Sequence, residues 1–198
     1  MGHVASTALF GGTFDPIHNA HLEIARAAAD RFDLAKILFV PAANPPHKPG
    51  GANASYEDRV RMAELACAAD RRFEVSRIEA PAGGGGTRSY SILTIEKLQA
   101  LGVKPLSFLI GADAFGEIRT WHRWRDVVAS VEFIVVTRPG ARWEIPPGAI
   151  VHELAGLDLP VSSSDIRRQV MEGASRIPVP DAVLDYIREH KLYRSQPQ

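Results

Sequence analysis

Two histidines, His18 and His21, stand three residues apart just after a glycine-containing segment, residues 11–18 (GGTFDPIH). The alanine-rich stretch 22–29 that follows is typical of a helix, and side chains three residues apart share one face of a helix. The start of a helix favours anions through its unpaired amides and its dipole. Glycines at a strand-to-helix turn let a ligand approach the backbone closely. The pattern predicts a phosphate site at the end of the first strand.

Zinc binding and a purely structural role are the alternatives for this histidine pair. Zinc-binding pairs on a helix more often stand four residues apart, as in H-E-x-x-H, and the chain offers no obvious third and fourth ligands. Two surface histidines with satisfied hydrogen bonds would explain the pair if it stood alone. The glycines, together with Asp15 and Pro16 as a helix-start signature, favour the phosphate site.

A second group of candidate ligands is the run of serines Ser162, Ser163 and Ser164, followed by Arg167. Ser162 and Asp165 predict a capping box, which by itself could explain the serines. The same residues also place several hydroxyls and a permanently charged, forked guanidinium within one turn of a helix start, which suits phosphate oxygens. Two such helix starts in one chain match a triphosphate, which needs contacts at both ends.

Three other segments carry side chains or amides suited to a nucleotide. Residues 44–48 (NPPHK) follow the second predicted strand and could present positive charge, although a solvated loop is the alternative. Gly111 and Asp113 end the fourth predicted strand, where they could contact a ribose or simply form a turn with an Asp helix cap. Trp121 and Trp124, three residues apart, could share a helix face, in the core or stacked on a heteroaromatic base.

The elements that must position these residues alternate between strand-like and helix-like patterns. The strands are predicted at residues 6–10, 36–41, 72–79, 106–111, 131–137 and 149–154. The helices are predicted at residues 17–32, 56–69, 91–101, 122–129, 164–172 and 180–190. Continuous apolar runs such as 37–40 and 133–136 suit strands that are covered on both faces. The pattern predicts an α/β fold with a doubly wound parallel sheet, helices on both faces, and a ligand beyond the carboxyl ends of the strands.

Composition is that of an ordinary globular protein. The 198 residues are 45% hydrophobic and 23% charged, and 23 basic side chains balance 23 acidic ones. Nothing in this balance indicates a nucleic-acid or membrane partner, and no apolar run is long enough to span a bilayer. Cys67 is expected to be a buried, unpaired thiol, in keeping with a reducing, cytoplasmic setting. We expect one domain over residues 1–198, with a glycine-rich loop at 83–86 that is a candidate lid and an irregular connection at 138–148.

The chain resembles the bacterial nicotinate-nucleotide adenylyltransferases, which are nucleotidyltransferases with an H-x-G-H signature. The resemblance rests on residues 11–18, on PPHK at 45–48 and on SSSDIR at 162–167. Residues 88–91, 111–113, Trp121, 138–140 and 187–193 follow in the family's order. It implies a Rossmann-like nucleotidyltransferase fold, with the region from about 160 to 198 as a helical part that carries the S-S-S-x-I-R motif.

The resemblance also implies a reaction. Adenylyl transfer from ATP to nicotinate mononucleotide would give deamido-NAD and pyrophosphate, with Mg²⁺ carried on the ATP phosphates and no protein side chain as a metal ligand. It implies catalytic roles for His18, His21 and Arg167. The implied ATP contacts are Gly12, Thr13, Phe14, His18, His21, Gly111, Asp113, Ser162, Ser163 and Arg167. The implied contacts to the mononucleotide are Asn44, Lys48, Ser91, Trp121 and Arg138. The implied partners are small molecules, and a homodimer is compatible with the family.

Two positions depart from the family's pattern, and they leave other functions open. Ala20 stands where the signature usually has glycine, and Leu93 stands where an acid is usual. Nicotinamide mononucleotide and pantetheine phosphate are therefore alternative acceptors. A non-catalytic nucleotide-binding module of the same fold is a further alternative, against which the retained His18, His21, Lys48 and Arg167 argue. A fragment of a class I aminoacyl-tRNA synthetase shares the histidine pattern, but the neutral charge argues against it.

Overall fold

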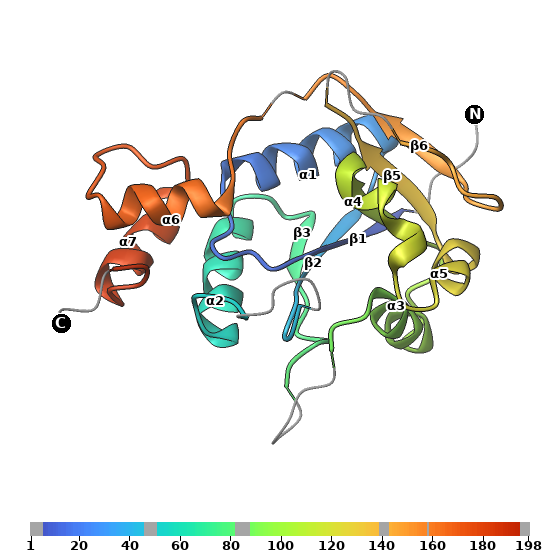
Figure 1. Cartoon of the computed structure of the whole chain (residues 1–198), viewed down its shortest axis with the longest axis horizontal. Coiled ribbons are helices and arrows are strands. Elements are labelled where there is room, and N and C mark those ends of the chain that lie inside the picture. Colours follow the sequence, from blue (N-terminus) through green and yellow to red (C-terminus); the bar gives the residue numbers. More distant parts are fainter. Residues whose placement is uncertain (1–5, 46–50, 82–87, 139–142, 158, 195–198) are drawn as a thin grey trace.

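The computed structural model describes residues 6–45, 51–81, 88–138, 143–157 and 159–194. Within these ranges six strands form one parallel sheet in the order β3-β2-β1-β4-β5-β6 (Figure 1). The strands are β1 (Thr7–Gly12), β2 (Lys36–Pro41), β3 (Phe73–Val75), β4 (Leu106–Gly111), β5 (Glu132–Val136) and β6 (Val151–Leu154). This arrangement confirms the predicted doubly wound α/β fold.

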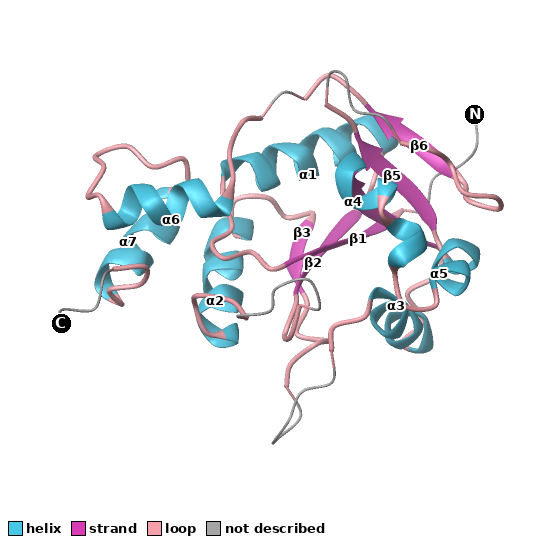
Figure 2. Cartoon of the chain, viewed as in Figure 1, coloured by secondary structure: helices cyan, strands magenta, loops and turns pink. Residues whose placement is uncertain are grey.

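Helices cover both faces of the sheet (Figure 2) because alternate strand residues point to opposite sides. Ala8 and Phe10 of β1 join one hydrophobic cluster, whereas Leu9 joins the other. The first cluster includes residues of α1 (Asn19–Phe32), α2 (Tyr56–Cys67), α6 (Ser163–Met171) and α7 (Asp181–Glu189). The second includes residues of α3 (Ser91–Ala100), α4 (Ala112–Gly116), the 3-10 turn η1 (Ile118–Thr120) and α5 (Trp124–Ser130).

The sheet opens between β1 and β4, where the strand order reverses. These two strands pair only at their beginnings, from Thr7 opposite Leu106 to Leu9 opposite Phe108. Beyond that point β1 continues against β2, and β4 continues against β5. The carboxyl ends of β1 and β4 therefore diverge, which creates the switch-point crevice where open α/β sheets bind their ligands.

The region around the histidines differs from the prediction in its details. Gly11 and Gly12 do not form the turn, because they extend β1 and pair with Val40 and Pro41 of β2. Asp15 and Pro16 do not begin the helix. They belong to the connection that follows β1, and α1 begins only at Asn19, with His18 in extended conformation as its N-cap.

Two further predictions were wrong at their boundaries. The strand predicted over 72–79 ends at Val75, because after Ser76 donates its amide to the Phe39 carbonyl the chain leaves the sheet. Trp121 and Trp124 do not share a helix face. Trp121 follows the turn η1 in extended conformation. Arg123, with a φ of 52°, is the N-cap of α5, which begins at Trp124. The short helix α4 and the turn η1 were not predicted.

The C-terminal helices α6 and α7 lie to one side of the sheet, where α7 packs against α2 (Figure 1). Ile166, Val183 and Ile187 are fully buried and belong to the same hydrophobic cluster as α1 and α2. These contacts bring the start of α6 next to the connection between β1 and α1, where two of the predicted phosphate-binding segments meet.

Candidate active site

The histidine pair is a built feature of the start of α1. The two imidazole rings stack with their centroids 3.7 Å apart and an angle of 29° between their planes. The backbone N–H of His18 donates to Nδ1 of His21 at 3.2 Å. Because Nδ1 of His21 accepts this hydrogen bond, the proton of the neutral ring lies on Nε2, where it can be donated to a ligand.

Burial keeps both imidazoles neutral at pH 7. It lowers the pKa of His18 from 6.5 to about 4. It also lowers the pKa of His21 well below 6.5, and the nearby His18 adds to the effect. The rings therefore act at this site as hydrogen-bond donors and not as charged groups. Nδ1 of His18 is buried and has no partner among the described residues, so a ligand atom could complete its hydrogen bonding.

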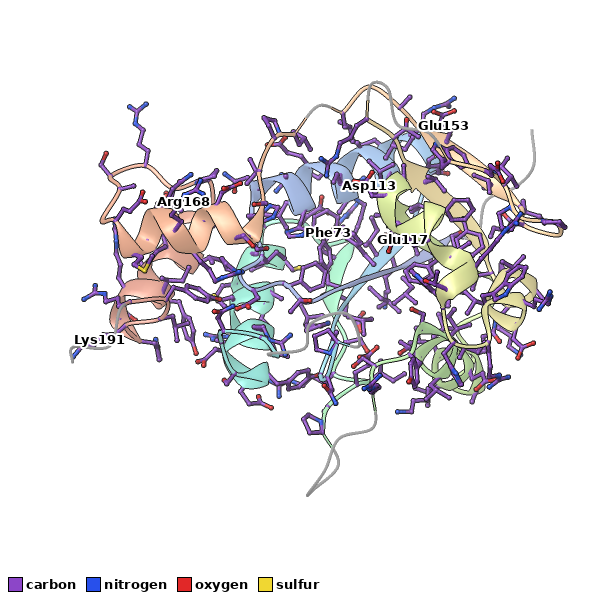
Figure 3. All side chains as sticks on the ribbon, viewed as in Figure 1. Phe73, Asp113, Glu117, Glu153, Arg168 and Lys191 are labelled. Atoms are coloured by element: carbon purple, nitrogen blue, oxygen red, sulfur yellow. The ribbon has the colours of Figure 1, made fainter. Side chains whose placement is uncertain are left out.

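A cavity of about 170 Å³ lies next to the histidines, at the crevice between β1 and β4. Its walls include Phe10 from β1, Gly111 from the end of β4, and Asp113 from α4 (labelled in Figure 3). Arg138, which follows β5, lines this cavity and lies 3.8 Å from the Asp113 carboxylate. The structure thus places Arg138 beside residues predicted to bind ATP, and its predicted contact with the mononucleotide stays a prediction.

Two further cavities continue along the carboxyl edge of the sheet. One, of about 220 Å³, shares Phe10 and Gly111 with the histidine cavity and also contacts Gly12. The next, of about 530 Å³, is lined by the segment 88–91 and by residues 120–122. Ser91 and Trp121 line both, so the structure brings together these two residues that were predicted to bind one substrate. Beside them lie the rings of Tyr90 and His122, whose centroids are 4.4 Å apart.

The start of α6 is fixed to the connection between β1 and α1. Nη1 of Arg167 donates to the carbonyl of Asp15 at 2.7 Å, and the hydroxyl of Ser163 donates to the carbonyl of Pro16 at 2.9 Å. The hydroxyl of Ser162 accepts from the amide of Asp165, which confirms the capping interaction. All three side chains form hydrogen bonds within the protein, and their predicted contacts with ATP remain a prediction.

Gly12 and Phe14 have packing roles here. The ring of Phe14 is buried and contacts the ring of His21 at 5.1 Å, edge to face. A Cβ at Gly12 would lie 2.9 Å from the Phe14 ring, closer than real Cβ contacts. The absent side chain therefore lets Phe14 support His21, and the carbonyl of Thr13 is in turn held by Nη1 of Arg59 at 2.7 Å.

Three residues of the site were not singled out from the sequence. Glu79 lines the 220 Å³ cavity and accepts hydrogen bonds from the hydroxyl of Thr94 and the amide of Ala43. Arg59 is 1% exposed, and its place on the apolar face of α2 was a detectable signal. The Tyr193 hydroxyl donates to the carboxylate of Asp15, which lies 178 positions earlier in the sequence, and no local pattern could have indicated this hydrogen bond.

Some residues predicted to belong to the site lie outside the described residues or next to them. Lys48 and the neighbouring 46–47 are outside the described residues, as are the glycine loop 83–86 and residues 139–142 of the predicted irregular connection. Asn44 is described, and its backbone exchanges hydrogen bonds with Ser89. Ala20 is buried at the wall of the histidine cavity.

The described residues also bear on two other features, a metal site and a membrane-spanning helix. Among the described residues there is no group of three or more His, Cys, Asp or Glu side chains that could hold a metal ion. In the part of the chain that the structure describes, no helix has the length and apolar character needed to cross a membrane. Cys67 is buried and unpaired, as predicted, and burial raises its pKa to about 12.

The fold and the site together define a nucleotide-binding α/β protein of the nucleotidyltransferase type. Residues 9–169 match the cytidylyltransferase-like family. The chain is 57% identical to the probable nicotinate-nucleotide adenylyltransferase of Solibacter usitatus, over 94% of this chain and 98% of the relative. It is 39% identical to the protein of the same name from Geotalea uraniireducens, over 93% and 96%. The chain belongs to the cytidylyltransferase-like family, as a relative of its nicotinate-nucleotide adenylyltransferases.

Solved structures share the fold. The nicotinic acid mononucleotide adenylyltransferase of Plasmodium falciparum in complex with NaAD superposes with a TM-score of 0.74, at 18% identity and over 94% of this chain and 96% of that one. The same protein in complex with APC gives a TM-score of 0.72 at 17% identity over the same shares. At this identity the likeness concerns the order and packing of the strands and helices.

Proposed function

We propose that this protein transfers the adenylyl group of ATP to nicotinate mononucleotide, releasing pyrophosphate and forming deamido-NAD. The observation that carries the proposal is the stacked, neutral histidine pair at the switch-point crevice, where a buried ring nitrogen of His18 has no partner among the described residues. Hydrogen-bond donors at a helix start and within a crevice suit phosphate oxygens. The names of the relatives in the preceding section point to the same reaction.

In the proposed complex the triphosphate of ATP lies against the start of α1. His18 and His21 donate hydrogen bonds to its oxygens, and Arg138, which lines the same cavity, supplies positive charge. Gly111 and Asp113 are positioned for the adenosine, at the end of β4. Thr13 and Arg167 belong to the framework behind the triphosphate, and Ser162 and Ser163 hold the start of α6 beside it. The Arg167 side chain is 20% exposed, so part of it remains open to solvent.

Nicotinate mononucleotide is assigned to the adjoining cavities. The ring of Trp121 would stack on the pyridine ring, and Ser91, at the start of α3, would face the carboxylate. Arg88 lines the same cavity and offers a cation to an acidic substrate. Asn44 is held next to these cavities by its hydrogen bond to Ser89, which lines both, and Lys48 is assigned to the phosphate of the mononucleotide.

The chemical step asks mainly for positioning. An oxygen of the mononucleotide phosphate, already ionised at neutral pH, forms a bond to the α-phosphorus of ATP while the bond to the bridging oxygen of pyrophosphate breaks. No general base is needed, so the protein contributes alignment and donors for the charge that builds up on the leaving pyrophosphate. Mg²⁺ bound to the phosphates of ATP would supply further neutralising charge. This division of labour suits neutral imidazoles, which donate without adding a charge of their own.

The test is pyrophosphate release with ATP and Mg²⁺ in the presence of nicotinate mononucleotide, nicotinamide mononucleotide or phosphopantetheine. The proposal predicts kcat/KM at least tenfold higher for nicotinate mononucleotide than for the other two, with deamido-NAD as the product. Comparable rates with the amide would contradict the assigned specificity and would direct attention to Leu93 beside Ser91. No release with any acceptor would instead support a non-catalytic nucleotide-binding module.

A further inference from the structure

The carboxylate of Asp15 is held by several hydrogen-bond donors close to the histidine pair. It is fully buried. Oδ2 accepts from the backbone amide and the side-chain amide of Asn53, at 2.8 and 3.2 Å. Oδ1 accepts from the backbone amide of Ala54 at 3.1 Å and from the hydroxyl of Tyr193 at 2.9 Å. Four donors thus hold one carboxylate three residues before His18, and only the hydroxyl comes from the end of the chain.

We propose that Tyr193 is a positioning residue for adenylyl transfer, because its hydroxyl fixes Asp15 and thereby the connection from which His18 and His21 reach the phosphates. The inference rests on the proposed function, since it concerns the same histidine pair. Tyr193 itself lines none of the three cavities and is assigned no contact with a substrate.

The end of α7 brings Tyr193 to this position. The helix ends at Glu189, and Lys191 (labelled in Figure 3) adopts a left-handed conformation with φ 53°. The amide of Leu192 then donates to the carbonyl of Ile187 at 3.0 Å, a bond of the kind that closes a Schellman motif. Leu192 and Tyr193 both pack against the hydrophobic cluster that α1 and α2 share. The turn is therefore anchored, and the Tyr193 hydroxyl is held at Asp15.

The connection between β1 and α1 needs such support. Phe14 has a φ of 49°, which is an uncommon conformation for a residue with a side chain and persists where the surroundings impose it. The backbone on the far side of Asp15 leads within three residues to the His18 amide, whose hydrogen bond orients the ring of His21. A shift of Asp15 is thus transmitted directly to both imidazoles. Burial and the negative charge of Asp15 also raise the pKa of Tyr193, which keeps its hydroxyl protonated as a donor.

The experiment compares Tyr193→Phe with Tyr186→Phe. Tyr186 is a matched control, because its hydroxyl also donates to a carboxylate at 2.9 Å, but that carboxylate belongs to Asp58 on α2 and not to the histidine connection. For each variant we would measure kcat and the KM for ATP well below its unfolding temperature. The backbone amide signal of His18 and the ring nitrogen signals of His21 would be recorded by NMR without any substrate.

We expect Tyr193→Phe to lower kcat roughly tenfold with a KM for ATP within about twofold of wild type, because small displacements of aligned groups act on the reacting geometry. The His18 and His21 signals should shift in Tyr193→Phe and stay in place in Tyr186→Phe. Unchanged signals and an unchanged kcat in Tyr193→Phe, or equal losses in both variants, would overturn the proposal. Wild-type protein without activity, combined with shifted signals, would refute the proposed function and leave the positioning intact.

A second variant keeps the test decisive if Tyr193→Phe does not fold. Asn53→Ala removes a different donor, the side-chain amide, from the same Asp15 carboxylate. The proposal predicts changes of the same direction in kcat and in the His18 amide signal, of smaller size because the Asn53 backbone amide still donates. The absence of both changes in a folded Asn53→Ala protein would overturn it.

Discussion

Acidification should destabilise this protein through His18, by an amount that follows from its burial. His18 is 5% exposed, and the pKa of its ring falls from 6.5 in an exposed histidine to about 4 in the folded protein. At pH 7.5 the ring is neutral in both the folded and the unfolded chain, so it has no effect on the free energy of unfolding. As the pH falls below 6.5 the unfolded chain binds a proton that the folded protein does not, and stability is lost until the pH reaches about 4.

The size of this loss can be worked out. One pKa unit corresponds to about 1.4 kcal/mol, so the full difference between 6.5 and 4 is about 3 kcal/mol. At pH 4.5 most of this amount should have been lost. The depressed pKa of His21 acts in the same direction. These amounts are a large part of the stability of an ordinary domain.

Urea unfolding at several pH values between 7.5 and 4.5 measures the effect. His18→Gln removes the titrating ring, so its free energy of unfolding should fall by roughly 2–3 kcal/mol less than that of wild type over this range. His190→Gln is the control, because His190 follows α7 and is exposed. If wild type and His18→Gln lose stability in parallel, His18 is not held neutral by burial and the reasoning is refuted.

Three other variants or reagents test separate parts of the site. His21→Ala should lower kcat about a hundredfold or more and leave the Kd for ATP within a few-fold of wild type, because the donor acts mainly on charge that develops in the transition state. An unchanged kcat in steady-state kinetics would contradict the role assigned to His21. Gly12→Ala should lower the free energy of unfolding in urea by about 1–3 kcal/mol, since the new Cβ would lie 2.9 Å from the Phe14 ring. Gly11→Ala should lower it clearly less, because its Cβ would lie 3.8 Å from the nearest side-chain atom. Equal losses in the two variants would speak against this packing. Cys67, with its pKa raised to about 12 by burial and by Asp70, should react with a thiol reagent at pH 7.5 only when the protein unfolds, so rapid labelling of the native protein would contradict its placement.

Local and periodic features of the structure were accessible from the sequence. Continuous apolar runs such as 37–40 mark strands that are covered on both faces, and all six predicted strands are present in the sheet. The histidine pair at the start of α1 was accessible because its spacing, its glycines and the following helix are neighbours in the chain. The capping interaction between Ser162 and Asp165 was accessible for the same reason.

Features that depend on distant contacts were not accessible. The depressed pKa values of His18 and His21 arise from burial, which residue spacing alone does not reveal. The bond between Tyr193 and Asp15 joins residues 178 positions apart. The end of β3 at Val75, which frees Glu79 to line a cavity, depends on where the neighbouring strand β2 offers a carbonyl. In each case the outcome is set by tertiary packing and not by the local pattern.

The most direct test of the account is a titration of the protein with ATP and Mg²⁺, followed through the ring nitrogen signals of His18 and His21. If the triphosphate lies against these imidazoles, both sets of signals should move with the same saturation curve. The pKa of His18 should then rise above its value of about 4 in the free protein, because phosphate charge stabilises the protonated ring. ATP that saturates the protein while both imidazoles keep their signals and the pKa of His18 stays at about 4 would contradict the account.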